Sequence, residues 1–328
     1  MTLSYSLRLF SLCFASFFLV HTAARVALRL AEHSVQRFAD RLSPRVAARL
    51  LLFLRVFPAA IALVAVFGVC APSYVRFETN LPSEQVGILC LAIALLGAVV
   101  WALALSRGLH AIVSSVRFSR ACLALGESVH VQDQPSPMLV IPGSNAFFAQ
   151  AGILRSQVMI SQNLMAEFSS DELAAALQHE CAHWISRDNL KRLLFAFLPD
   201  VFPLWSGFRA IERSWAKFAE RAADDFVSAQ GQNHAVSLAS ALVRLARMGQ
   251  VHSPMPTPLA TSPLGGTDDL SGRVHRLLEP TPAVHASALR RLGIIYGIVA
   301  VSLTCCLAAM AWPTTLAPVH ELLERLLH

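Results

Sequence analysis

Two histidines four residues apart, with a glutamate beside the first, stand out in the stretch QHECAHWISRD at residues 178–188. Positions i and i+4 share one face of a helix, so His179 and His183 can offer two imidazole nitrogens to one ion. Glu180 projects beside them. Zinc hydrolases use this pattern, with the glutamate as the general base that takes a proton from water. Surface helices also carry it by chance, so a further ligand is needed to decide its meaning.

A catalytic zinc site needs a third protein ligand and an open position for water. One solution adds a histidine six residues after the pair, with a glycine between, but those positions hold Asn189 and Ser186. The other solution is a glutamate from a later helix, and FAERAADDF supplies Glu220, thirty-seven residues after His183. Asp224 lies one turn further on the same face, where its carboxylate can accept the outer N–H of a ligand histidine.

Two other acidic residues of that predicted helix, Glu212 and Asp225, are rival ligands. The small residues at 219, 222 and 223 would let the helix approach the first one closely. We therefore expect one zinc ion per chain, held by the two histidines and Glu220. Cys181 is two residues after the first histidine and points away from the ligand face, so we expect it to be a packed thiol.

The elements that must position these residues are predicted from the pattern of the segment 106–291. Ser169 with Glu172 three residues later is typical of a capping box at a helix start. Pro199 is expected to end that helix. In chain order, the predicted elements are a helix over 106–125, a small sheet of short strands within 126–161, helices over 168–198, 204–231 and 233–248, and a short helix at GRVHRLLEP.

The composition is unusual for a soluble protein, with 55% hydrophobic and only 15% charged residues. A mean hydropathy of +0.53 indicates membrane segments. A bilayer requires about 20 apolar residues in a helix. Four stretches are predicted to cross it: residues 3–20, where Arg8 interrupts the run, 56–75, 86–105 and 292–312.

The arginines predict the orientation. Seven arginines and only two acidic residues lie between the first and second runs. Short loops with such an excess of basic residues stay on the cytoplasmic side of the membrane. This argues against a cleaved signal peptide and places both termini outside. The formal charge of +6 sits mostly beside apolar runs and is not clustered with aromatic residues, so no direct nucleic-acid binding is expected. Seven cysteines form no paired framework.

These observations predict a mainly α, multi-pass membrane protein that carries an α+β zinc domain. The expected organisation is a membrane region with three spans over 1–105, a cytoplasmic zinc domain over 106–291, a fourth span over 292–312 and a short external tail over 313–328. Whether the apolar run 193–208 dips into the membrane or is an ordinary connector is left open.

Together the motifs resemble the membrane-embedded gluzincin zinc metallopeptidases. The HtpX and CAAX-prenyl-protease type has an Asn-Ala-Phe segment on an edge strand, the two-histidine helix and a Glu-x-x-x-Asp motif. Residues 145–147, 179–183 and 220–224 match it in that order. The antirepressor type, the transmembrane protease of β-lactam sensors, is similar in its four spans and its zinc domain between spans three and four. The Arg187-Asp188 pair resembles both types.

The resemblance implies a zinc endopeptidase of the cytoplasmic (inner) membrane that cleaves protein or peptide substrates, with Glu180 as general base on a zinc-bound water. It implies regulatory cleavage of a cytoplasmic winged-helix repressor, or quality-control proteolysis. An extended substrate would pair with the strand at Asn145. The HtpX type carries a His-Pro pair where this chain has Ser262 before a proline. Arg273 or His275 would then polarise the scissile carbonyl.

Two other classes of function compete with this reading. One is a catalytically silent membrane signalling or scaffold protein that retains a structural zinc site, although a structural site has no need of Glu180. The other is a metal-handling membrane protein, which the nearly uncharged spans disfavour.

Overall fold

The structure, a computed structural model, describes residues 4–77, 86–129, 138–143, 148–153, 157–200, 207–248, 270–279 and 321. The predicted fourth span at 292–312, the substrate strand at 145–147 and nearly all of the predicted tail lie outside the described residues. The domain boundaries drawn from the sequence therefore remain predictions.

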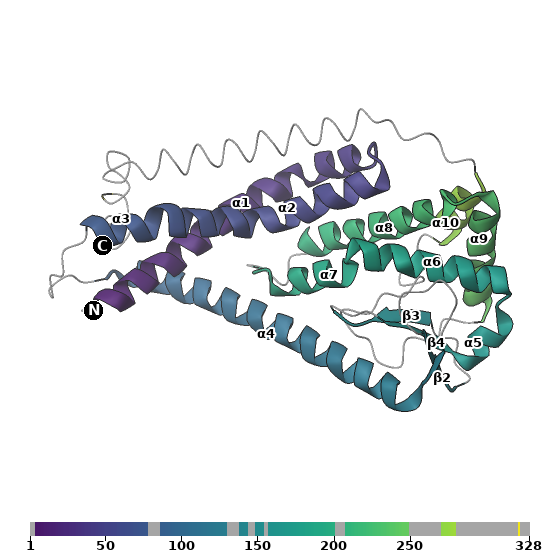
Figure 1. The fold of residues 1–328 in the computed structure, drawn as a ribbon. Helices are drawn as coiled ribbons and strands as arrows, with labels where there is room; N and C mark the ends of the chain where they lie inside the picture. Colours follow the sequence, from purple (N-terminus) through teal and green to yellow (C-terminus); the bar gives the residue numbers. More distant parts are fainter. Residues whose placement is uncertain are drawn as a thin grey trace.

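Three helical stretches in the described part of the chain are long and apolar enough to cross a membrane (Figure 1). Each of them covers most or all of one of the first three predicted spans, which confirms the mainly helical membrane fold. The third stretch runs on past the predicted end of its span to Leu125, as expected for 106–125. The stretches are α1 (Tyr5–Ala39), α4 (Ile88–Leu125), and α2 (Pro44–Ala65) continued by a π-helical segment (Val66–Cys70) and α3 (Ala71–Phe77).

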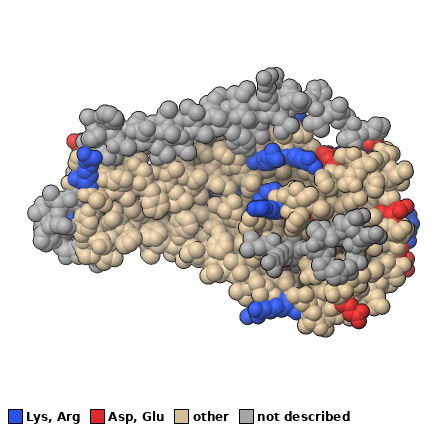
Figure 2. All heavy atoms as spheres, viewed as in Figure 1, with Lys and Arg blue, Asp and Glu red and all other residues tan. Residues whose placement is uncertain are grey.

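The arginine-rich segment between the first two spans is itself helical. The first helix continues to Ala39, and the second begins at Pro44, a residue suited to the first helical position because it lacks an N–H. The resulting hairpin extends beyond the apolar runs. In Figure 2, charged residues gather over the half of the molecule that holds α6 to α10, while the half built from α1 to α4 shows few of them.

A four-stranded sheet confirms the strands predicted within 126–161. Its order is β1-β2-β4-β3, so β3 is the outermost strand on one side of the described sheet. The central pair is parallel, and both outer pairs are antiparallel. The strands are β1 (Glu127–Val129), β2 (Met138–Ile141), β3 (Phe148–Ala151) and β4 (Gln157–Ser161).

The sheet is covered on both faces because its buried side chains alternate. Ala149 and its partner Met159 pack against Phe118 of α4. Phe148 and its partner Ile160 belong to the core on the other face, which contains residues of α6 and α9. Successive side chains along each strand therefore point to opposite faces of the sheet.

In the described part of the chain, six further helices follow the sheet or border it. The helices predicted over 204–231 and 233–248 and the short helix at GRVHRLLEP are confirmed with small shifts of their ends. They are α5 (Gln162–Glu167), α6 (Ser170–Ser186), α7 (Asp188–Phe197), α8 (Gly207–Ser228), α9 (Gln232–Arg247) and α10 (Leu270–Leu278).

The capping box at the start of α6 is confirmed. The Ser169 hydroxyl accepts from the Glu172 backbone N–H at 3.2 Å, and the Glu172 carboxylate accepts from the Ser169 N–H at 2.9 Å. The same carboxylate also binds the Ser240 hydroxyl and the Arg244 guanidinium of α9. This fixes the start of the two-histidine helix against the core.

The prediction of one continuous helix over 168–198 was wrong. Arg187 has a left-handed backbone, with φ 54°, and separates α6 from α7. The apolar periodicity continues across the break, so it gave no sign of the bend. After this bend, α7 packs against α4, where Phe197 lies directly on Gly108. Residues 201–206, which were predicted to belong to the same connector, lie outside the described part.

The helix that carries Glu220 rests on the membrane hairpin. Trp215 and Phe218 of α8 share a buried core with Leu51 of α2 (Figure 1). Arg55 of α2, which is 2% exposed, pairs with Glu212 of α8 at 2.7 Å. The position of α8 is thus set jointly by the membrane hairpin and by α6.

Candidate metal centre

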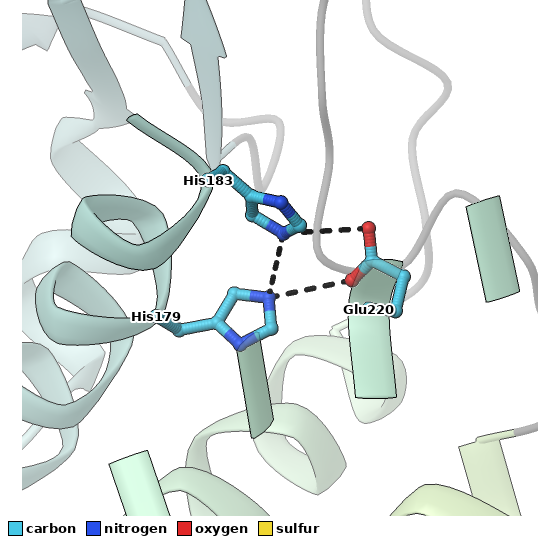
Figure 3. Close-up of side chains that lie close together, drawn as sticks. All are labelled: His179, His183 and Glu220. Atoms are coloured by element: carbon cyan, nitrogen blue, oxygen red, sulfur yellow. Dashed lines mark hydrogen bonds and ion pairs between the residues drawn. The ribbon is translucent and has the colours of Figure 1, made fainter. Parts of the chain in front are cut away.

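The three residues predicted as ligands meet between α6 and α8 (Figure 3). The Nε2 atoms of His179 and His183 lie 3.2 Å apart. The carboxylate of Glu220 faces both, with one oxygen 3.3 Å from Nε2 of His179 and the other 3.5 Å from Nε2 of His183. The three ligand atoms all lie within 4.8 Å of one another. Two imidazoles and a carboxylate are a set of donors suited to zinc.

Each imidazole is held from behind by a carboxylate. The Nδ1 atom of His183 lies 2.8 Å from Oδ2 of Asp188, and Nδ1 of His179 lies 3.2 Å from Oδ1 of Asp224. A carboxylate at the outer nitrogen favours the tautomer that leaves Nε2 free to bind a metal. Asp224 thus lies beside Nδ1 of His179, where an outer partner of a ligand histidine was predicted, and Asp188 forms the equivalent contact with His183.

Asp188 was missed as a site residue by the sequence reasoning. It follows His183 by five residues, and on one straight helix its side chain would not face that histidine. The left-handed Arg187 turns the chain and brings the Asp188 carboxylate back to the imidazole. Lys191 binds the other oxygen of Asp188 at 2.7 Å. The Arg-Asp pair that supported the resemblance was the only signal in the sequence.

Arg273 of α10 reaches the same cluster. Its guanidinium binds both oxygens of Asp224 at 2.7 and 2.8 Å, and it lies 3.3 Å from Glu220. Its side chain is thus engaged by acidic residues of the site, while contact with a substrate carbonyl remains a prediction. His275, the other candidate for that contact, is 73% exposed and pairs with Glu279. Asn145, the third predicted substrate residue, lies outside the described part.

Glu180 is completely buried beside the two histidines. Neither of its carboxylate oxygens has a hydrogen-bond partner among the described residues. Burial raises the pKa of Glu180 above the usual value for a glutamate. A carboxylate with a raised pKa is a stronger base, which is the property that proton transfer at neutral pH requires.

The charges of the cluster favour a divalent cation. Burial alone would lower the pKa of His183, but Glu220 and Asp188 raise it to about 10, which shows how strongly the carboxylates attract positive charge. Four carboxylates against two cations leave two negative charges, which one divalent ion would balance. These described groups are Glu180, Asp188, Glu220 and Asp224 on one side and Lys191 and Arg273 on the other. One oxygen of Glu220 is also buried without a hydrogen bond among the described residues.

The rival ligands have other partners. Glu212 binds Arg55, and Asp225 binds Arg276 of α10. Neither belongs to the group of ligand atoms that converge in the described part of the chain. Cys181 is a free, half-buried thiol outside that group, as its position in the motif predicts.

Comparison with known families agrees with this geometry. Residues 109–248 match the family model described as peptidase family M48. The matched stretch runs from the second half of α4 to the end of α9 and includes the two-histidine motif, Glu220 and Asp224, but not Arg273. Among the curated proteins and the solved structures, no match to the chain is found.

Proposed function

Because residues 109–248 match the model of peptidase family M48, we propose that the chain is a membrane-bound zinc endopeptidase that cleaves protein substrates. The observation that carries the proposal is the convergence of Nε2 of His179, Nε2 of His183 and the Glu220 carboxylate from two helices. The three apolar helices that precede the sheet support a site held close to a bilayer.

His179, His183 and Glu220 would hold one zinc ion per chain. Zinc bound there supplies a Lewis acid, which lowers the pKa of water and polarises a carbonyl group. Asp188 and Asp224 keep the two imidazoles in the tautomer that presents Nε2. Arg273 neutralises part of the charge of Asp224 and Glu220 and thereby keeps both carboxylates in place.

Glu180 is the proton carrier of the proposed reaction. Its carboxylate takes a proton from water as the water oxygen forms a bond to the carbon of the scissile peptide. The protonated Glu180 then gives that proton to the peptide nitrogen as the C–N bond breaks, which leaves a carboxyl group and an amine. Its isolation from hydrogen-bond donors of the described chain keeps both oxygens available for this transfer.

The decisive experiment is Glu180→Gln in the full-length protein purified in detergent. The variant should retain one zinc per chain by elemental analysis, because Glu180 is not a ligand. Its rate of casein cleavage should fall by about 10²–10⁴-fold, which is the usual contribution of a general base to the rate. Glu167→Gln makes the same change at a half-exposed position of α5 and should cleave like the wild type.

Equal cleavage by Glu180→Gln and the wild type would refute the assignment of the base. A zinc-loaded wild type that cleaves neither casein nor itself would instead support the catalytically silent scaffold.

We also propose that the catalytic domain faces the cytoplasm, which the arginine-rich hairpin between α1 and α2 supports. Its substrates would be proteins at that membrane face, with a winged-helix repressor as the regulatory candidate and damaged membrane proteins as the quality-control candidate. A reporter that is active only in the cytoplasm should stay silent after His328 and be active when inserted after Gly231, at the turn between α8 and α9. The opposite pattern would reverse the proposed orientation.

A further inference from the structure

A cavity of about 400 Å³ lies beside the proposed metal centre, between the end of β3 and the bend that joins α6 to α7. One of the residues that line it is His183, so the cavity adjoins the place where a scissile peptide would sit. Its volume is within the range of known small-ligand sites, about 300–1,000 Å³. The proposed reaction uses His183 but assigns no purpose to this space.

The cavity is a built feature because two elements are tied together at its wall. The amide nitrogen of Asn189 donates to the carbonyl oxygen of Gly152 at 2.9 Å, which fixes the end of β3 to the start of α7. The preceding residue, Asp188, holds the imidazole of His183. Two adjacent residues thus set the distance between the outermost strand and the metal-binding histidine.

The pleat of β3 places a buried side chain at the cavity. Gln150 lies on the same face of the strand as Phe148, which packs toward α6, and it is 3% exposed. A peptide extended along β3 would present alternate side chains to the two faces, as substrates do when they add to a sheet edge. Every second side chain of such a peptide would therefore point toward the cavity.

The lining favours a large, uncharged side chain. Ile153, Trp184 and Leu190 contribute apolar surface, and Trp184 and Leu190 are 44% and 37% exposed in the described structure. Covering exposed apolar surface in a concave site with an apolar group is favourable, because both surfaces are removed from water. Such a group would replace water against all three side chains.

The charges of the lining disfavour a basic side chain. Arg187 lines the cavity, is exposed, and has no ion-pair partner among the described residues. The carboxylate of Asp188, which also lines it, is already occupied by His183 and Lys191. A lysine or arginine of a substrate would meet an unneutralised guanidinium and no free carboxylate.

We infer that this cavity is the subsite for a substrate side chain next to the scissile bond, and that it selects aromatic or large aliphatic residues and rejects lysine and arginine. The inference rests on the proposed function, since it needs a peptide substrate at His183. It adds Ile153, Trp184, Arg187 and Leu190 as residues that determine specificity.

The test is digestion of casein by the full-length protein in detergent, with the new termini mapped by mass spectrometry. One position adjoining the cut should be enriched in Phe, Tyr, Trp, Leu and Met and depleted in Lys and Arg. Ile153→Trp fills the cavity and should shift that position toward Ala and Ser by at least about tenfold, since pocket size discriminates by about 10–200-fold.

Two further variants widen the test. Leu190→Ala enlarges the cavity and should shift the same position toward Trp, and Arg187→Gln should admit lysine there. Val236→Trp places the same bulky group at an exposed position of α9 that does not line the cavity, and should keep the wild-type preference. Zinc content, measured in each protein, reports whether the metal centre is intact.

The outcomes separate the two proposals. Cleavage with no preference at any position adjoining the cut, or a preference that Ile153→Trp and Leu190→Ala both leave unchanged, would overturn the subsite and leave the peptidase function standing. A zinc-loaded wild type that produces no cuts would overturn the proposed function and the subsite with it.

Discussion

Asp188→Asn should weaken zinc binding although Asp188 is not a ligand. One carboxylate oxygen of Asp188 lies 2.8 Å from Nδ1 of His183, and the other accepts from Lys191 at 2.7 Å. Burial alone would raise the pKa of Asp188, but these two partners hold it below its usual value, so the group is charged at neutral pH. An asparagine has one acceptor oxygen, and its N–H₂ group can only donate, so its two ends cannot accept from both partners as the two carboxylate oxygens do.

The magnitude follows from this mismatch. Lys191 can only donate, so the asparagine oxygen turns toward it and the amide N–H₂ faces His183. That histidine must then accept at Nδ1 and carry its proton on Nε2, the atom that faces Glu220. Lost outer partners of ligand histidines typically cost 10–100-fold in metal affinity. We expect a loss of that size, which is about 1.4–2.8 kcal/mol at about 1.4 kcal/mol per tenfold.

The assay is zinc competition against a fluorescent chelator, with the full-length protein in detergent at pH 7. Asp171→Asn makes the same change at an exposed position in the first turn of α6 and should bind zinc like the wild type. The double variant Asp188→Asn/Lys191→Met is the sharper test. Without the lysine, the asparagine can turn its oxygen to His183, so affinity should partly recover.

Two results would contradict the reasoning. Unchanged zinc affinity in Asp188→Asn would mean that the carboxylate does not orient His183. No recovery in the double variant would mean that the competition between His183 and Lys191 is not the cause of the loss.

Three further predictions concern stability and can be checked by thermal unfolding in detergent. Glu212→Gln should cost about 1–3 kcal/mol because the buried Arg55 loses a charged partner, and Arg55→Met/Glu212→Met should be more stable than the single variant. Glu172→Gln should cost about 1–2 kcal/mol at pH 7. Burial would raise the pKa of Glu172 but its hydrogen bonds lower it, so its contribution is complete above the unfolded pKa and disappears as pH falls through the folded one. The difference in stability between the wild type and Glu172→Gln should therefore become smaller below about pH 4, and it should not become smaller at pH 8. Gly97→Ala should cost about 1–3 kcal/mol, since its Cβ would lie 2.5 Å from the carbonyl oxygen of Phe14 on α1, and an unchanged melting temperature would show that the two helices separate freely.

The long elements and the two-histidine motif could be predicted from the sequence because their signals are local. The capping box at Ser169 depends on residues three apart, and the spans depend on the uninterrupted apolar runs of single helices. The end of α6 could not be predicted in this way. Apolar spacing continues through Arg187, and only packing against α4 and β3 favours the left-handed turn there.

The choice among three acidic residues of α8 shows the same limit. Glu212, Glu220 and Asp225 all lie on one predicted helix, and the motif favoured Glu220 without excluding the others. Their side chains point to different neighbours, because the rotation of α8 is fixed by its packing on the membrane hairpin. Of these three, only Glu220 faces the histidines in the described structure.

What the sequence determined by itself was the donor set and the membrane setting, since both depend on residue types and on spacing along single helices. The tertiary structure decided which groups surround those donors. Asp188 returns to His183 only after a bend, and Arg273 reaches Asp224 from forty-nine residues further along the chain. A contact between distant segments depends on the relative position of whole helices, which the pattern within one helix does not encode.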